Sequence, residues 1–390
     1  MIIQEAKRLG SIQEYYFSRK NAEIAEMNKT GIPVINLGIG SPDLRPSDET
    51  IDKLHEIAMR EDSHGYQPYR GDLELRKAIS AWYGKTFGVK SDPNSEVLPL
   101  AGSKEGIMHI TMSFVNEGDE VLVPDPGYPT YASVTLLAGA KIRNYKLKEE
   151  SGWQIDFDEL EKQDLSKVKL MWSCFPNMPT GVRATDETYN RLIALARKNK
   201  FLLVNDNPYS LVLNYEYKSI LTYGGAREVA LEMNSLSKSH NMAGWRVGWV
   251  IGEKDYIDSV MKFKSNMDSG IFLGIQRAAV KALENSDEWH IKRNEEYRER
   301  RKLAEELAAK LGLTFDKNQV GLFLWCKIPA YMPSGEWLSD KVLKEARVFI
   351  TPSFIFGSTG ERFVRISLCT KQKNFREAIE RIGSLDLISE

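Results

Sequence analysis

The sequence predicts an α/β protein in which helices flank a mostly parallel central sheet, with a smaller α+β domain beside it. Two observations predict this fold. Between residues 72 and 235, short apolar runs alternate with helical patterns, which is typical of parallel sheets. Beyond residue 285 the pattern changes to one long charged helix followed by isolated strands and helices. A chain of 390 residues, 42% of them hydrophobic, can bury the cores of two such units.

The elements of the predicted large domain, residues 46–285, follow in order along the chain. Apolar strands are expected at 97–100, 120–123, 141–145, 168–172, 201–204 and 229–233. Helical periodicity covers 73–83, 104–114 and 185–198, between these strands.

The predicted small domain combines residues 1–45 with residues 286–390. Its expected helices cover 12–27, 288–311, 337–346 and 375–382, and its expected strands cover 320–328 and 362–368.

The bulk composition narrows the possible classes of function. The 53 lysines and arginines nearly balance 54 acidic residues, so the net charge of −1 offers no basic field for nucleic acid. Cys174, Cys326 and Cys369 have neither zinc-ligand nor disulfide-framework spacing, and we expect them to be reduced. The charged N-terminus lacks a signal-peptide core, and no stretch is apolar for long enough to span a bilayer. We therefore expect a cytoplasmic protein that binds neither nucleic acid nor a membrane.

Unusual polar residues cluster where the predicted strands end. Such clusters occur at 101–104, 124–131, 175–181, 206–209 and 235–238. In a parallel sheet the carboxyl ends of the strands share one edge, and ligands bind there. We therefore expect one binding site to draw on all five clusters.

Lys238 is the main candidate for chemistry. It follows Ser235-Leu236-Ser237 and precedes Arg246 by eight positions, so hydroxyls and small residues surround it instead of a solvated run of charges. A lysine near a cationic arginine loses its proton more readily and becomes a nucleophilic amine. The alternative is a buried lysine paired with a carboxylate, but the serines and Arg246 favour an amine beside a bound phosphate.

Two further clusters suit a heteroaromatic ring. Asp206 would keep a pyridine nitrogen protonated, and Tyr209 would hydrogen-bond a ring hydroxylate, which together make the ring an electron sink. Asn177 lies in the stiff segment Pro176-Asn177-Met178-Pro179-Thr180-Gly181 and can be held toward the same ring. Taken alone, the Asp206 cluster is better explained as a turn that Asp206 caps, and the Asn177 segment has an ordinary rigid loop as its alternative. Their coincidence with the other strand ends favours a binding site.

Two motifs beside predicted helices also favour a site that binds a phosphate and an aromatic ring. Ser103 and Lys104 open a predicted helix, where a hydroxyl and free backbone N–H groups suit a phosphate. Tyr128 lies on the constrained turn Asp125-Pro126-Gly127-Tyr128, from which its ring can stack on a bound ring. Either motif alone is also consistent with packing.

Arg365 is the candidate for binding a carboxylate. Val364 and Ile366 flank it, so it should lie on a strand between buried neighbours. A guanidinium in that setting suits bidentate recognition of a substrate carboxylate. The alternative is a structural ion pair, and the sequence alone does not separate the two.

Together these residues resemble the class I/II pyridoxal-phosphate aminotransferases of fold type I, over essentially the whole chain. Six motifs occur in the order and spacing of that family: Asn36-Leu37-Gly38-Ile39-Gly40-Ser41-Pro42-Asp43; Tyr66 with Gly71, Leu75 and Arg76; Gly102-Ser103-Lys104; Pro176-Asn177 with Pro179-Thr180-Gly181; Asp206 with Tyr209; and Ser235-Leu236-Ser237-Lys238 with Arg246. The resemblance implies an enzyme that uses pyridoxal 5'-phosphate to move an amino group from an L-amino acid to a 2-oxo acid by a ping-pong mechanism.

The resemblance also implies a role for each residue around the cofactor. Lys238 would bind the cofactor covalently and move the proton at the substrate α-carbon. Asp206 would pair with the pyridinium nitrogen, Asn177 and Tyr209 would bond the ring oxygen, and Tyr128 would stack on the ring. Contacts to the phosphate are implied for Ser103, Lys104 through its backbone, Ser235, Ser237 and Arg246.

Other implied roles concern the substrate and a second subunit. Tyr66 would reach the phosphate from the neighbouring subunit, which implies a homodimer with shared active sites. Arg365 would bind the α-carboxylate of the amino acid, and Gly40 would lie against the substrate. The nearest branch holds prokaryotic aspartate and LL-diaminopimelate aminotransferases, where a lysine at the Lys104 position and a tyrosine near Tyr15 touch the substrate. Acidic or dicarboxylic substrates are therefore expected.

One departure from the family and several alternatives stay open. Pro352-Ser353 stands where the family often has Pro-Gly ahead of Phe356-Gly357, so we expect a reshaped substrate-side loop. A β-lyase acting on cysteine-type substrates uses the same fold and lysine, and relatives also accept aromatic or apolar amino donors. We do not expect the effector-binding half of a DNA-binding regulator, because little sequence precedes Tyr15. The five histidines lack metal-ligand spacing and no Gly-x-Ser-x-Gly motif occurs, so neither a metal site nor a hydrolase is expected.

Overall fold

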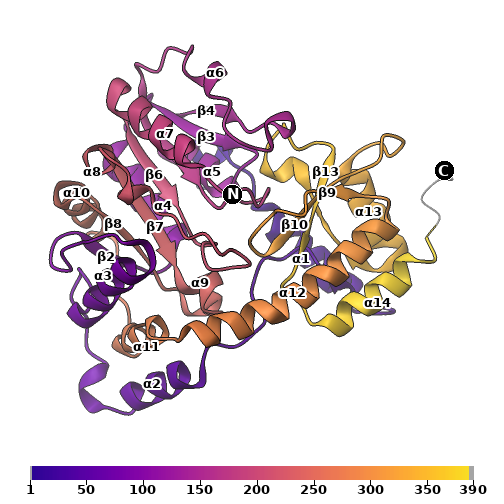
Figure 1. The fold of residues 1–390 in the computed structure, drawn as a ribbon, viewed down its shortest axis with the longest axis horizontal. Helices are drawn as coiled ribbons and strands as arrows, with labels where there is room; N and C mark the ends of the chain where they lie inside the picture. The colour runs from indigo at the N-terminus through magenta and orange to yellow at the C-terminus, as the bar shows by residue number, and fades with distance from the viewer. Residues whose placement is uncertain (1, 386–390) are drawn as a thin grey trace.

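A seven-stranded sheet dominates the larger of two units (Figure 1). The structure is a computed structural model that describes residues 2–385. The strand order is β2-β8-β7-β6-β5-β3-β4, and within this sheet only β8 (Gly248–Gly252) runs against the others. The other strands are β2 (Val97–Leu100), β3 (Glu120–Asp125), β4 (Lys141–Lys146), β5 (Val168–Cys174), β6 (Leu202–Asp206) and β7 (Ala230–Ser235). The predicted mostly parallel sheet is confirmed.

Helices flank this sheet, as predicted. The helices of the larger unit are α2 (Asp48–Ala58), α3 (Leu73–Phe87), α4 (Ser103–Phe114), α5 (Pro129–Leu137), α6 (Phe157–Leu160), α7 (Asp186–Asn199), α8 (Ala226–Val229), α9 (Leu236–Ser239), α10 (Lys254–Lys264) and α11 (Leu273–Leu283). Their ends follow local chemistry: a capping box between Thr185 and Thr188 starts α7, and Gly88, with φ +74°, ends α3.

The smaller unit is α+β, as predicted, and lies on the right in Figure 1. Its antiparallel sheet has the order β12-β13-β10-β9, built from β9 (Thr314–Phe315), β10 (Phe323–Lys327), β12 (Thr351–Pro352) and β13 (Phe363–Ser367). Its helices are α1 (Tyr16–Met27), α12 (Asp287–Lys310), α13 (Gly335–Ala346) and α14 (Gln372–Ile382). The short strands β1 (Ile35–Asn36) and β11 (Val348–Phe349) form a separate parallel pair. The domain limits 46–285, 1–45 and 286–390 stay predictions.

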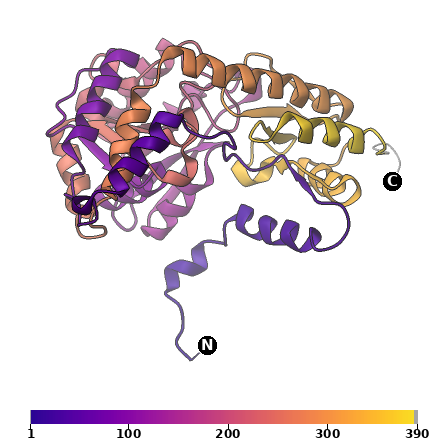
Figure 2. The ribbon, with the colours of Figure 1, turned by 90° about the horizontal axis from the view of Figure 1, so that it is seen from below.

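The N-terminal segment differs from the prediction. The expected helix at 12–27 begins only at Tyr16, and a 3-10 helix, η1 (Lys7–Ser11), precedes it. Helix α1 buries Ile24 against Leu343 and Phe349 of the smaller unit. Residues 2–6 project from the body in Figure 2, whereas η1 lies near α5. Tyr15 interrupts the helical pattern because its backbone is extended (φ −55°, ψ 125°) and its side chain enters a cavity.

Two strands also differ from expectation. The strand expected at 320–328 begins at Phe323, because the N–H groups of Val320 and Gly321 donate to Gly181 and Val212 in the larger unit. Strand β8 was not anticipated, although Trp249, Val250 and Ile251 are fully buried in the sheet.

Short helices complete the connections. They are η2 (Glu61–Ser63), η3 (Glu149–Ser151), η4 (Ile220–Thr222), η5 (Ala243–Trp245) and η6 (Ser353–Phe356). Among the described residues, no helix combines the length and apolar character needed to cross a membrane. The carboxyl ends of β2, β3, β5, β6 and β7 all face the same edge of the sheet, and this shared direction positions the site.

Candidate active site

Two cavities adjoin at the carboxyl edge of the seven-stranded sheet. The sheet-edge cavity, of about 380 Å³, is lined by Ser103, Lys104, Tyr128, Tyr131, Cys174, Met178, Asp206, Pro208, Tyr209, Ser235, Ser237, Lys238, Ala243 and Arg246. The aromatic cavity, of about 230 Å³, is lined by Tyr15, Phe17, Asn21, Ile39, Gly40, Ser41, Tyr128, Met178, Tyr209, Lys238, Phe323, Phe356 and Arg365. Because Lys238, Tyr128, Tyr209 and Met178 line both cavities, a group bound in one would meet a group bound in the other at Lys238.

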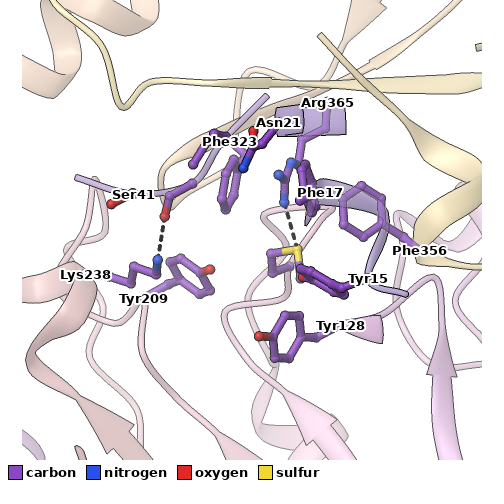
Figure 3. Close-up of a pocket in the computed structure, with 13 residues that line it drawn as sticks. Tyr15, Phe17, Asn21, Ser41, Tyr128, Tyr209, Lys238, Phe323, Phe356 and Arg365 are labelled. Carbon is purple, nitrogen blue, oxygen red and sulfur yellow. Dashed lines mark hydrogen bonds between the residues drawn. The ribbon is translucent and has the colours of Figure 1, made fainter. Parts of the chain in front are cut away.

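Lys238 lies in the one-turn helix α9, directly after β7. Its Nζ donates to the backbone oxygen of Gly40 at 2.5 Å (Figure 3). Burial lowers the pKa of this amine, and the charges of Arg365 and Arg246 lower it further. Among the described residues no carboxylate forms an ion pair with Lys238, so the structural alternative of a lysine–carboxylate pair is not supported.

Asp206 ends β6 and presents an unused acceptor to the sheet-edge cavity. Its Oδ2 accepts a hydrogen bond from Tyr131 at 2.8 Å, whereas its Oδ1 is buried without a hydrogen-bond partner among the described residues. Burial raises the pKa of this carboxyl from 3.8 to about 7. A buried acceptor without a partner is costly, and a protonated ring nitrogen would satisfy it. Tyr131, stacked on Trp172 with ring centroids 5.0 Å apart, holds the carboxyl in place.

Asp206→Asn should stabilise the cofactor-free protein at alkaline pH. The folded-state pKa of Asp206 exceeds its unfolded value of 3.8, so its contribution to stability is fully present below pH 3.8 and is lost as pH rises through about 7. Asparagine does not ionise in this pH range, so the variant lacks this pH-dependent loss of stability. The free energy of unfolding of the variant relative to wild type should therefore rise by roughly 3 kcal/mol between about pH 5 and pH 8 in urea denaturation. An equal difference at both pH values would contradict the shifted pKa.

The sheet-edge cavity also contains a cradle for an anion. Ser103 is the first residue of α4, whose N-terminal N–H groups suit an anion. The Ser235 hydroxyl accepts the Ser237 N–H at 3.1 Å, and Arg246 Nη1 lies 3.4 Å from Ser237 Oγ. Gly102 has φ +88°, and a Cβ added there would lie 2.0 Å from Arg246 Nη2. The chain therefore keeps room for the guanidinium beside the helix terminus.

Arg365 is buried in the aromatic cavity without a carboxylate partner among the described residues. One Nη donates to the backbone oxygen of Gly38 at 2.8 Å, and Nε has no partner. The guanidinium carbon lies 3.9 Å from the ring centroid of Phe323 and 4.7 Å from that of Phe356 (Figure 3). Burial lowers the pKa of Arg365 to about 10. The other Nη donates to Met178 Sδ at 3.2 Å. A buried cation held by aromatic faces, a carbonyl and a thioether suits an external carboxylate, and the alternative of a structural ion pair is not supported.

The structure brings most of the predicted site residues together. Lys104 and Tyr15 approach from the two cavities, with Lys104 Nζ 4.6 Å from the Tyr15 ring centroid. Burial lowers the pKa of Lys104, and the Arg246 charge adds to this. Gly40 lies so close to Phe323 that an added Cβ would be 2.4 Å from the ring.

Two predicted residues do not line either cavity. Asn177 is buried, and its Oδ1 accepts the Thr180 hydroxyl at 2.8 Å. The adjacent Met178 lines both cavities instead. Tyr66 is 94% exposed, so its predicted role depends on a second subunit.

Several lining residues were missed in the sequence. Tyr131 lies in the motif that also contains Tyr128, three positions later on α5, and that spacing was an available signal. Phe17, Phe323 and Phe356 come from separate elements of the smaller unit, and only the tertiary structure brings them around Arg365.

The structure also forms a cluster around the buried His109 that histidine spacing did not reveal. His109 Nε2 lies 3.2 Å from Glu105 and 3.8 Å from Asp268, without hydrogen-bond alignment to either. The ligand atoms of these three residues lie within 4.8 Å of one another, as in a metal site. Lys264 Nζ already neutralises Asp268 at 2.6 Å, while Glu105 accepts the Ala101 N–H beside the anion cradle. The cluster therefore braces the first turn of α4.

The chain matches one protein family over most of its length. Residues 32–382 match the profile of aminotransferase class I and II. The chain is 38% identical over 387 residues to the LL-diaminopimelate aminotransferase of Halothermothrix orenii, with 99% of both chains covered. It is 37% identical over 382 residues to that of Aquifex aeolicus, with 97% of this chain and 98% of the relative covered.

Solved structures of similar fold agree with this assignment. Apo-BacF of Bacillus subtilis matches with a TM-score of 0.94 and 35% identity, over 99% of both chains. The aspartate aminotransferase of Thermus thermophilus with maleate matches with a TM-score of 0.90 and 25% identity, over 98% of this chain and 99% of that chain. The predicted family, fold type and enzyme class are confirmed, and the chain is a member of the class I and II aminotransferases.

Proposed function

We propose that the protein is a pyridoxal 5'-phosphate-dependent aminotransferase that moves the amino group of an acidic or dicarboxylic L-amino acid to a 2-oxo acid. The observation that carries this proposal is the placement of Lys238 where the two cavities meet. One cavity offers an anion cradle and the unused Asp206 acceptor, and the other offers Arg365, which has no carboxylate partner among the described residues. These groups fit a phosphorylated pyridine and an amino-acid carboxylate.

The residues of the sheet-edge cavity fit the cofactor group by group. Ser103, Ser235, Ser237, Arg246 and the Lys104 N–H would hold the phosphate. Asp206 Oδ1 would accept the ring N–H, Tyr128 would stack on the ring, and Tyr209 would bond the ring oxygen. Asn177 lines neither cavity and its Oδ1 is bonded to Thr180, so it would have to turn its amide nitrogen toward the same ring oxygen. When bound, the cofactor supplies an electron sink for the substrate α-carbon. Oriented by Tyr131, Asp206 would keep the ring nitrogen protonated.

Lys238 would serve first as the nucleophile that holds the cofactor and then as the base at the substrate α-carbon. Both roles need a neutral amine, and burial together with two nearby arginines lowers its pKa in that direction. Arg365 would anchor the α-carboxylate, and Gly40 would lie against the substrate. Tyr15, Phe17, Phe323 and Phe356 would exclude water from the aromatic cavity.

The substrate class rests on the relatives and on one pair of residues. The similar curated proteins are LL-diaminopimelate aminotransferases, and a similar solved structure is an aspartate aminotransferase. Lys104, a partly exposed residue that lines the sheet-edge cavity close to the Tyr15 ring, would meet the distal carboxylate of such substrates.

A donor panel tests this proposal. The visible absorption of the purified protein with added cofactor is followed after adding aspartate, glutamate, LL-diaminopimelate, phenylalanine or cysteine, each without an oxo acid. Loss of the visible band with a dicarboxylic donor, and its return with 2-oxoglutarate, is expected. Band loss only with phenylalanine would overturn the substrate class, and catalytic pyruvate formation from cysteine without an acceptor would indicate a β-lyase.

We also propose a homodimer in which Tyr66 completes the phosphate site of the partner. Its 94% exposure in one chain supports this placement. Mixing inactive Lys238→Ala with Tyr66→Ala under conditions that exchange subunits should restore about a quarter of wild-type activity, because each hybrid has one intact site. Mixing Lys238→Ala with Asp206→Ala is the control. Both residues of each site come from the same chain, so neither site of a hybrid dimer would be intact and no activity should return.

A further inference from the structure

Asp125, the last residue of β3, binds a loop of the smaller unit through both of its carboxylate oxygens. Oδ2 accepts the Ser358 hydroxyl at 2.6 Å, and Oδ1 accepts the Thr359 hydroxyl at 2.8 Å and the Thr359 N–H at 3.1 Å. Asp125 is 2% exposed and, among the described residues, forms no ion pair. Hydroxyl and amide donors alone therefore satisfy this buried carboxylate.

The bound loop also contacts the larger unit through its backbone. The Gly127 N–H donates to the Phe356 oxygen at 2.7 Å. Gly357, between Phe356 and Ser358, has φ +138°, and a Cβ added there would lie 2.1 Å from Asp125 Oδ1. Only glycine fits this approach, so the loop and the carboxylate are closely matched.

This loop carries the aromatic ring that covers Arg365. Phe356 is 4% exposed and lines the aromatic cavity, with its ring centroid 4.7 Å from the guanidinium carbon (Figure 3). Since no carboxylate of the described residues fixes the guanidinium, the surrounding rings, the Gly38 oxygen and the Met178 Sδ set its orientation. A shift of the loop would therefore shift the group that meets the substrate carboxylate.

We infer that Asp125 is a positioning residue that holds the Phe356 loop against the larger unit and thereby orients Arg365 toward the substrate carboxylate. Asp125 acts through Phe356 and does not touch the substrate. The inference deepens the proposed function, on which it rests, by adding a residue that determines how tightly the carboxylate is bound.

The test compares Asp125→Asn with the double variant Ser358→Ala/Thr359→Val and with the control Asp119→Asn. Asp119 lies just before β3, at its opposite end, where it accepts the Asn116 N–H. The readouts are kcat and KM for the best donor, the affinity for succinate by calorimetry, and the affinity for pyridoxal 5'-phosphate. Thermal denaturation reports folding.

Both loop variants should raise KM and weaken succinate binding by about tenfold, with kcat and cofactor affinity changed less than about twofold. Asp119→Asn should leave all of these unchanged. In Phe356→Leu, further mutation of Asp125 should have little added effect, because both act through one ring.

Unchanged succinate affinity in a folded Asp125→Asn protein would overturn the inference, as would equal losses in kcat and cofactor affinity or full additivity with Phe356→Leu. Failure of the proposed function would give a different result, because the wild-type protein would then transfer no amino group from any donor. In that case the affinity for succinate still tests the role of Asp125.

Discussion

Lys238→Ala is expected to abolish amino-group transfer, with a loss of at least about 10³-fold in kcat. The amine is the only group that lines both cavities and can act as nucleophile and base, so no neighbour within the described residues replaces it. Pyridoxal 5'-phosphate should still bind, because the anion cradle and Asp206 are untouched. Steady-state kinetics with an acidic donor and a cofactor titration of the variant check both expectations.

The stability of the same variant separates a functional lysine from a structural one. Lys238 has a lowered pKa and no carboxylate partner, so its removal should leave the unfolding free energy of the cofactor-free protein nearly unchanged. Lys264, 2% exposed and paired with Asp268 at 2.6 Å, is the matched control. Lys264→Ala should cost about 3 kcal/mol by leaving the partly buried Asp268 carboxylate without its buried cation. If Lys238→Ala destabilised as strongly, the amine would have a structural role.

The strand-end positions of the site could be predicted from the sequence because the sheet obeys a simple geometric rule. Apolar runs locate the strands, and parallel strands bring their carboxyl ends to one edge. Ser103, Asp206, Ser235 and Lys238 follow such runs and line one cavity. The local apolar pattern was therefore enough to predict that these four residues share one site, although the antiparallel strand β8 interrupts the parallel order.

The surroundings of Arg365 could not be predicted in this way. Phe17 lies on α1, Phe323 on β10 and Phe356 on η6, and no periodicity links these elements. The sequence therefore left open whether Arg365 forms a structural ion pair. The same limit applies to Tyr15, whose entry into the cavity breaks a helical pattern.

Arg365→Lys is expected to raise KM for the amino donor by about 10²-fold while kcat falls less. The guanidinium presents two parallel donors to a carboxylate, whereas an ammonium presents a single point charge, and losing a buried charge-assisted pair costs about 3 kcal/mol. Cofactor affinity should not change, because Arg365 lines only the aromatic cavity. The affinity for succinate, measured by calorimetry, should fall with KM.

Arg362→Lys is the matched control for this prediction. Arg362 lies three residues earlier and donates to the backbone oxygens of Met332 at 2.6 Å and Pro329 at 2.6 Å, so it supports a turn of the smaller unit. Its replacement should lower the melting temperature without changing KM. Since Arg365 donates to a single backbone oxygen, that of Gly38, and to the weak acceptor Met178 Sδ, its replacement should affect binding more than stability. Equal KM values for wild type and Arg365→Lys would mean that another cation binds the α-carboxylate, and Lys104 would be the first to replace.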